Sequence, residues 1–203
     1  MRIEDLPALR ALDLFAGMAE EPFEALLRPA FLQRFPTQVD LVVEGERPDF
    51  MHVVVEGLVE LRAGTAGRET TLGLLRPLST FVLAAVLTDR PYLMAARTLA
   101  PSRLLLVPAE LVRETMAADA AFAHAIVRHL AGAFRTAIKD LKGHTLRGAA
   151  ERLANWLLRE AAAAGGDQVE LDVEKRTLAA LLGMTPENLS RAFVTLGAYG
   201  VEV

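Results

Sequence analysis

The sequence contains no cysteine. This absence excludes disulfide bonds, thiolate-ligated zinc, cysteine-ligated iron–sulfur clusters and thiol redox switches. Long apolar runs are also missing: the longest, from Phe81 to Leu87, is far shorter than the ~20 residues that a membrane-spanning helix requires. Glu4 and Asp5 come early, where a secretory leader would carry basic and then apolar residues. We therefore expect a cytoplasmic protein with no membrane partner and no iron–sulfur cluster.

An excess of positive charge is lacking as well. The chain has 22 Lys and Arg against 26 Asp and Glu, a formal net charge of -4. Affinity for phosphates comes from clustered Lys and Arg, so this balance argues against a protein that coats nucleic acid without regard to sequence. It leaves room for specific binding, which needs only a local positive face. No Gly-rich phosphate loop, His/Glu metal pair or Ser or Cys nucleophile motif is present, and we expect no enzyme.

The hydrophobic periodicity changes twice along the chain. Residues 4–34 have apolar side chains at three- and four-residue spacing, which predicts helix. Short β-rich runs then follow at intervals of roughly ten residues, separated by turn sequences at 45–49 and 63–67. The predicted strands are 39–43, 51–55, 57–61, 70–74, 94–98 and 103–107. This spacing favours a compact antiparallel barrel or roll.

After Pro108 the pattern is helical. A helix over 117–141 carries an apolar stripe that consists of Phe122, Ile126, Leu130, Phe134, Ile138 and Leu141. About 25 residues would span nearly 40 Å, and a long helix with a sustained stripe commonly packs against a copy of itself. The alternative is a core helix of a single domain. A further helix over 146–164 ends at Gly165, and 169–173 is a short candidate strand.

Residues 175–196 have the layout of a helix-turn-helix. Leu178 and Leu182 lie on the apolar face of a first short helix, and Gly183 suits a turn that needs positive φ. Thr185 can cap a second helix that has Pro186 at its first position. The expected buried face of this second helix consists of Leu189, Phe193 and Leu196. The expected outward positions are Glu187, Asn188, Ser190, Arg191 and Thr195.

Those outward side chains suit the major groove of DNA. Glu187 can accept a hydrogen bond from cytosine N4, and Arg191 can donate two to guanine O6 and N7. Ser190 can contact a base edge or a phosphate, and Thr185 and Asn188 flank them. The alternative is an ordinary pair of helices with a solvated polar face, and periodicity alone does not separate the two interpretations.

The run LAALLGMTPENLSRAF, residues 178–193, resembles the DNA-binding motif of the Crp–Fnr family of transcription regulators. The Glu-x-x-Ser-Arg spelling resembles the fumarate–nitrate branch, whose half-sites are TTGAT or TTGAC in an inverted repeat. Residues 45–61 resemble the family's glycine-to-glycine hairpin in its β-roll. The resemblance covers nearly the whole chain in the family's order of elements.

The resemblance implies an α+β fold. Residues 1–115 would form a cyclic-nucleotide-binding-like β-roll sensor, 116–143 a dimerisation helix with a hinge at His144, and 144–203 a winged helix-turn-helix. The family continues with a two-stranded wing, whereas this sequence stops at 201–203, so we expect a truncated wing. The implied function is a homodimer that binds palindromic double-stranded DNA, with RNA polymerase as a partner if it activates. The alternative is an effector-binding module with a vestigial DNA-binding domain.

The expected effector pocket lies at Phe81, Ala84, Tyr92, Leu93 and Met94. In relatives that bind cyclic nucleotides, a Gly-Glu pair and an Arg-Ser pair hold the ribose and the phosphate. Here Ala84 replaces the carboxylate, Tyr92 the arginine and Leu93 the serine. A cyclic phosphate would be buried without a cation, at a prohibitive cost, so we do not expect cyclic AMP to bind. The only nearby cations are Arg90 and Arg97.

Residues 79–92 and 100–102 resemble the dissimilatory nitrate respiration regulators, a cysteine-free branch that senses nitric oxide or carbon monoxide with haem. Haem needs an apolar pocket and an axial ligand, most often His. The candidate ligands are His52, in a predicted strand, and His124 and His129, on the long helix; we select His52. The competing interpretation of each is a packed or solvated histidine, and an unknown apolar ligand, or none, is the alternative to haem.

Overall fold

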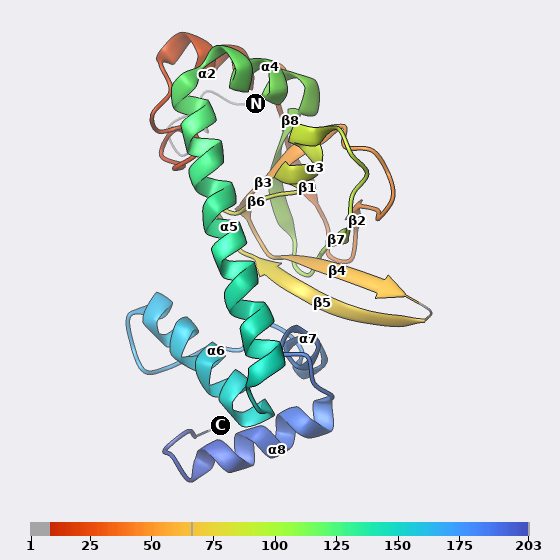
Figure 1. The fold of residues 1–203 in the computed structure, drawn as a ribbon, viewed down its shortest axis with the longest axis vertical. Coiled ribbons are helices and arrows are strands. Elements are labelled where there is room, and N and C mark those ends of the chain that lie inside the picture. Colours follow the sequence, from red (N-terminus) through yellow and green to blue (C-terminus); the bar gives the residue numbers. More distant parts are fainter. Residues whose placement is uncertain (1–8, 66, 203) are drawn as a thin grey trace.

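The computed structural model describes residues 9–65 and 67–202, which form a β-roll at one end, a small helical domain at the other and a long helix between them (Figure 1). The strands are β1 Phe31–Phe35, β2 Asp40–Val42, β3 Phe50–Glu56, β4 Val59–Thr65, β5 Arg68–Leu75, β6 Thr80–Phe81, β7 Ala95–Thr98 and β8 Ser102–Pro108. The helices are α2 Glu20–Leu27, α3 Leu83–Thr88, α4 Ala109–Ala118, α5 Ala120–Leu146, α6 Ala149–Ala164, α7 Lys175–Leu181 and α8 Pro186–Gly197.

The roll consists of two four-stranded antiparallel sheets, in the orders β1-β8-β3-β6 and β2-β7-β4-β5. The inner faces of both sheets contribute to one apolar interior, which includes Val54, Phe81, Tyr92, Ala96 and Leu104. A second core lies on the other face of the first sheet, under α2, α4 and the start of α5. The α+β class and the antiparallel roll expected from the sequence are confirmed.

Two local expectations are wrong, and one helix was not predicted. The predicted helix over 4–34 extends too far: 31–35 form β1, whose backbone pairs with β8 along its whole length, while residues 1–8 lie outside the described part. The segment 169–173 is not a strand, since Val169, Leu171 and Val173 pack against the core of the helical domain instead. The apolar run after Phe81 forms the short helix α3, which the sequence analysis did not predict.

The long helix α5 connects the two domains. It starts after Asp119, whose side chain accepts a hydrogen bond from the Phe122 backbone N–H at 2.7 Å, and it continues through His144 to Leu146. The chain then turns at Arg147 and Gly148, which have extended backbone. The expected break at His144 is therefore wrong by about one turn, because the helical hydrogen bonds continue past that residue. In the described part of the chain, no helix is long and apolar enough to span a membrane.

Candidate nucleic-acid interface and sensor interior

The helix-turn-helix forms as the sequence predicts. Gly183 lies in the turn with φ of +62°, a left-handed conformation that favours glycine. Thr185 caps α8: its hydroxyl accepts a hydrogen bond from the Asn188 backbone N–H at 3.3 Å, and Pro186 occupies the first helical position. The turn and the cap fix the direction in which α8 leaves α7.

One face of α8 is buried and the opposite face is exposed. Leu189, Ala192 and Leu196 pack into the core of the helical domain. The predicted DNA-contacting side chains Thr185, Glu187, Ser190 and Arg191 are exposed, and Asn188 is half-buried. The structure therefore brings four of the five predicted side chains to solvent at the cap and along the first turns of α8, and leaves Asn188 partly covered.

The exposed groups are already ordered by contacts along the helix. The Arg191 guanidinium donates a hydrogen bond to the Asn188 amide oxygen, and the Ser190 hydroxyl donates to the Pro186 carbonyl at 3.0 Å. A hydrogen bond from Thr185 lowers the pKa of Glu187, with smaller contributions from its own backbone N–H and the charge of Arg191. Glu187 is therefore a carboxylate at neutral pH, and acts only as a hydrogen-bond acceptor.

The sequence analysis missed Arg152 in α6. Its Nε donates to the Leu182 carbonyl at 2.8 Å and one Nη to the Gly183 carbonyl at 3.3 Å, at the turn before α8. Its other Nη donates to the Arg147 carbonyl at 2.7 Å, at the turn between α5 and α6. Arg152 thus connects the two turns through hydrogen bonds. The sequence did not indicate this role, because a charged residue one turn into an amphipathic helix is ordinary.

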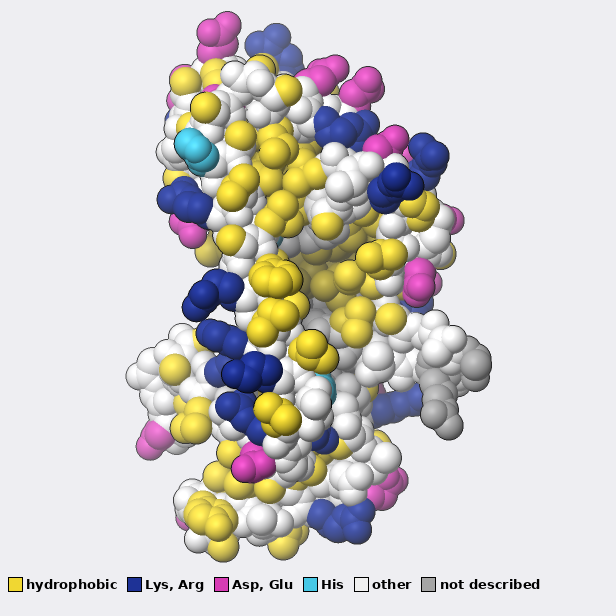
Figure 2. All heavy atoms as spheres, viewed as in Figure 1, with side chains coloured by type: hydrophobic (Ala, Val, Ile, Leu, Met, Phe, Trp, Pro, Cys, Tyr) yellow, Lys and Arg dark blue, Asp and Glu magenta, His cyan; other side chains and the backbone are white. Residues whose placement is uncertain are grey.

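The apolar stripe on α5 divides into two parts. Phe122 and Ile126 are fully buried in the core of the sensor domain, and the expectation that they face a second copy is wrong, because α2 and α4 cover them. Leu130 packs partly against the same core. Farther along, Phe134 is 67% exposed, and Ile138 and Leu141 are also exposed. Figure 2 shows apolar side chains gathered along this part of α5, with Lys and Arg beside them.

The predicted effector pocket is not gathered in one place. Phe81 and Tyr92 fill the interior of the roll, and Met94 is half-buried. Leu93 is 82% exposed and Ala84 is exposed on α3, so both are wrongly assigned to a pocket: neighbouring positions 92 and 93 point in opposite directions. Burial, together with the charges of Asp49 and Glu46, raises the pKa of Tyr92 to about 12, and the Tyr92 hydroxyl is neutral.

Neither nearby arginine supplies a cation to the roll interior. Arg90 is exposed, and Arg97 points away from the interior because its strand neighbour Ala96 points into it. The Arg97 guanidinium is paired at 2.8 Å with the buried carboxylate of Glu60, which also accepts a hydrogen bond from Thr71. Of the two arginines named above, neither is therefore placed to pair with a phosphate inside the roll.

His52 does not fit as a haem ligand in this conformation. Its Nδ1 is buried without a hydrogen-bond partner, as an unused ligand atom would be, and burial lowers the pKa of the imidazole to about 4, so the ring is neutral. However, His52 is only 4% exposed and its ring is stacked on Phe81 with the centroids 5.0 Å apart. None of the three cavities described in the structure has His52 in its wall. The competing interpretation, a packed histidine, describes it better.

Comparisons with known proteins agree with this two-domain structure. A cyclic nucleotide-binding domain matches residues 32–119, and a Crp-like helix-turn-helix domain matches 151–201. The CRP-like cAMP-activated global transcriptional regulator of Mycobacterium tuberculosis is 23% identical over 92% of this chain and 86% of its own. The potassium channel AKT2/3 of Arabidopsis thaliana is 30% identical over 55% of this chain, but the match spans only 14% of the channel.

Solved structures show the same arrangement. A regulatory protein from Silicibacter pomeroyi DSS-3 is 28% identical, with a TM-score of 0.64 over 97% of this chain and 91% of its own. DNR from Pseudomonas aeruginosa is 24% identical, with a TM-score of 0.57 over 99% and 91% of the two chains, a likeness that shows the fold alone.

The two domains define the class: a cyclic nucleotide-binding domain joined by a long helix to a Crp-like helix-turn-helix domain. The chain belongs to the Crp–Fnr family of regulators.

Proposed function

We propose that this protein is a homodimeric transcription regulator that binds a palindromic site in double-stranded DNA through α8. One observation carries the proposal: Glu187, Ser190 and Arg191 are exposed together on the solvent side of a capped helix whose other face is buried. An arginine and a carboxylate one turn apart on an exposed helix can read guanine and cytosine edges in the major groove. The residue pattern Glu-x-x-Ser-Arg, at residues 187–191, supports a TTGAT or TTGAC half-site.

The exposed part of the α5 stripe supports the homodimer. Phe134, Ile138 and Leu141 recur at four- and three-residue spacing, so they form one apolar seam along α5, and all three are exposed. A palindrome requires two copies of α8 about one DNA turn, ~34 Å, apart, and a dimer paired through this seam would supply the two copies. The proposed dimer contact therefore consists of Leu130, Phe134, Ile138 and Leu141, without the buried Phe122 and Ile126.

The sensor interior supports regulation by something other than cyclic AMP. Phe81 and Tyr92 fill the space, and the interior cluster of the described residues contains no Lys or Arg, so a cyclic phosphate would lose its hydration without compensation. The proposal also includes membership of the nitrate respiration branch and a cytoplasmic location. If the protein is an activator, RNA polymerase is its expected partner. These parts rest on the sequence motif and on the DNA target.

Gel-shift titration of the full chain tests this function. We expect a TTGAT palindrome to bind more tightly than a scrambled duplex by about 10³-fold or more at one fixed salt concentration. The salt must be held constant, because contacts to phosphates depend steeply on it. Equal, weak binding to both duplexes would instead support an effector-binding module with a vestigial DNA-binding domain. Adding cyclic AMP should leave the titration unchanged.

A further inference from the structure

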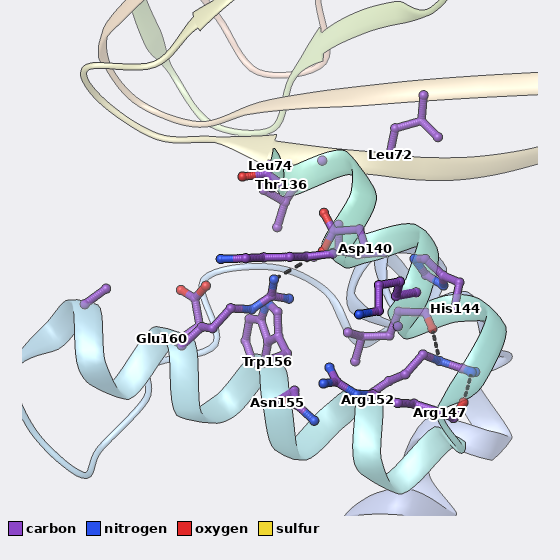
Figure 3. A pocket seen from close by; sticks show the side chains of 18 of the residues that line it. Leu72, Leu74, Thr136, Asp140, His144, Arg147, Arg152, Asn155, Trp156 and Glu160 are labelled. Atoms are coloured by element: carbon purple, nitrogen blue, oxygen red, sulfur yellow. Dashed lines mark hydrogen bonds and ion pairs between the residues drawn. The ribbon is translucent and has the colours of Figure 1, made fainter. Parts of the chain in front are cut away.

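A cleft lies between the sensor and the DNA-binding domain (Figure 3). Its volume is about 820 Å³, within the range of small-molecule sites. β5 forms one wall with residues 72–75, of which Leu75 turns its side chain to the roll interior; the last turns of α5 form the second wall, and α6 with Trp156 forms the third. A molecule in this cleft would touch both domains at once.

The cleft concentrates positive charge in a chain whose net charge is negative. Its lining includes six basic residues, Arg76, Lys139, Lys142, Arg147, Arg152 and Arg159, and only two acidic ones, Asp140 and Glu160.

Half of those cations already have partners. Arg76 pairs with Glu160 at 3.3 Å and with Asp172 at 3.1 Å, and Arg159 pairs with Asp140 at 3.2 Å. Arg152 is held by backbone carbonyls. By contrast, the side chains of Lys139, Lys142 and Arg147 have no ion pair with any residue that the structure describes. Three free cations beside an apolar wall favour an anion with an apolar body.

The proposed dimer would leave this cleft open. On α5 the lining residues Thr136, Asp140 and Gly143 repeat at four- and three-residue spacing and share one face. The seam begins at Phe134, two residues before Thr136. Two residues turn a helix by about 200°, so the seam and the cleft lie on opposite sides of α5. A second copy on the seam would therefore not fill the cleft.

We propose that this cleft binds a small phosphate ester with at least two negative charges and a compact apolar group. Lys139, Lys142 and Arg147 would contact the phosphates, and Leu74 of β5 would contact the apolar group. Because its walls come from both domains, a bound ester would stabilise the arrangement of the domains that forms the cleft. Only this last step rests on the proposed function; the binding itself does not.

Trp156 lines the cleft and is the only tryptophan of the chain, so its fluorescence reports on the site. We expect ATP, added to the full chain and excited at wavelengths where it does not absorb, to change the emission saturably with a Kd below about 1 mM. Pyrophosphate, which lacks the apolar group, should bind more weakly. Lys139→Gln and Arg147→Gln should each weaken ATP binding about tenfold. The matched control is Arg135→Gln, which removes a charge one turn away, outside the cleft lining.

Three outcomes would overturn the proposal. The first is no saturable change with either anion, and the second is equal weakening by Arg135→Gln and Lys139→Gln, which would indicate unspecific attraction. The third is that the parent chain does not bind ATP, while the cleft variants bind DNA more weakly and with a smaller dependence on salt. That result would assign these cations to contacts with the DNA backbone. Discrimination between the palindrome and the scrambled duplex is measured separately and depends on α8, so failure here leaves that function intact.

Discussion

The imidazole of His144, in the last turn of α5, lies directly against Gly183, in the turn of the helix-turn-helix. A Cβ built on Gly183 would be 2.7 Å from His144 Nδ1 and 3.0 Å from Cε1. The end of the long helix therefore rests on the turn that sets the direction of α8. A displacement of α5 would be passed to the recognition helix through this contact and through Arg152, which bonds to carbonyls at both turns.

Replacing Gly183 by alanine should destabilise the DNA-binding domain by roughly 1–2 kcal/mol. Two causes contribute: the left-handed backbone at φ of +62° is strained for alanine, and the new methyl group would clash with His144. Urea unfolding of Gly183→Ala against the parent chain measures the loss.

The double variant Gly183→Ala with His144→Ala separates the two causes. Removing the imidazole should restore the stability lost to the clash, but not the stability lost to backbone strain. The free energy of unfolding of the double variant should therefore lie between those of the parent and Gly183→Ala. If His144→Ala recovers nothing, the two residues are not in contact in solution.

Arg191→Ala should abolish the preference for the palindrome while leaving the dimer intact. A bidentate contact from arginine to guanine is worth about 1–3 kcal/mol of discrimination, and two copies act on each site. Competition gel shifts with palindromic and scrambled duplexes give the ratio, and sedimentation gives the mass. Arg176→Ala is the matched control, since Arg176 is exposed on α7 and lines a cavity next to the roll. A variant that still discriminates would show that α8 is not the reading helix.

The sequence predicted the elements whose local signals agree with their surroundings. Thr185, Pro186 and Gly183 encode the cap and the turn through their own backbone chemistry, and α6 ends before Gly165 at φ of 70° as predicted. Residues 31–35 were missed because their strand exists through pairing with β8, more than sixty residues away. The same applies to the stripe on α5: Phe122 and Phe134 share one periodicity, and only packing against α2 and α4 separates them.

Acid should destabilise the protein through His52. Burial lowers its folded-state pKa to about 4 from 6.5, so the unfolded chain binds the proton more tightly than the folded one. Above pH 6.5 the residue has no effect; as the pH falls from 6.5 to 4, stability is lost, up to roughly 3 kcal/mol.

Urea unfolding across this pH range measures the loss. His52→Leu should remove that part of the pH dependence, whereas replacement of the exposed His124 by glutamine should retain it. If the stability of His52→Leu and of the parent depends on pH in the same way, the imidazole is hydrated in the folded state.

Phe134→Glu should convert the dimer to monomers without unfolding the chain. Phe134 is 67% exposed in the single protomer, so its loss costs the fold little, but a second copy on the seam would bury two carboxylates opposite apolar side chains. We expect the dimer dissociation constant to rise at least roughly 100-fold, measured by sedimentation equilibrium. Thr136→Glu adds the same charge on the opposite side of α5 and should leave the dimer unchanged. If both variants dissociate, or neither does, the seam is not where two copies meet, and the half-site spacing proposed for the DNA needs another origin.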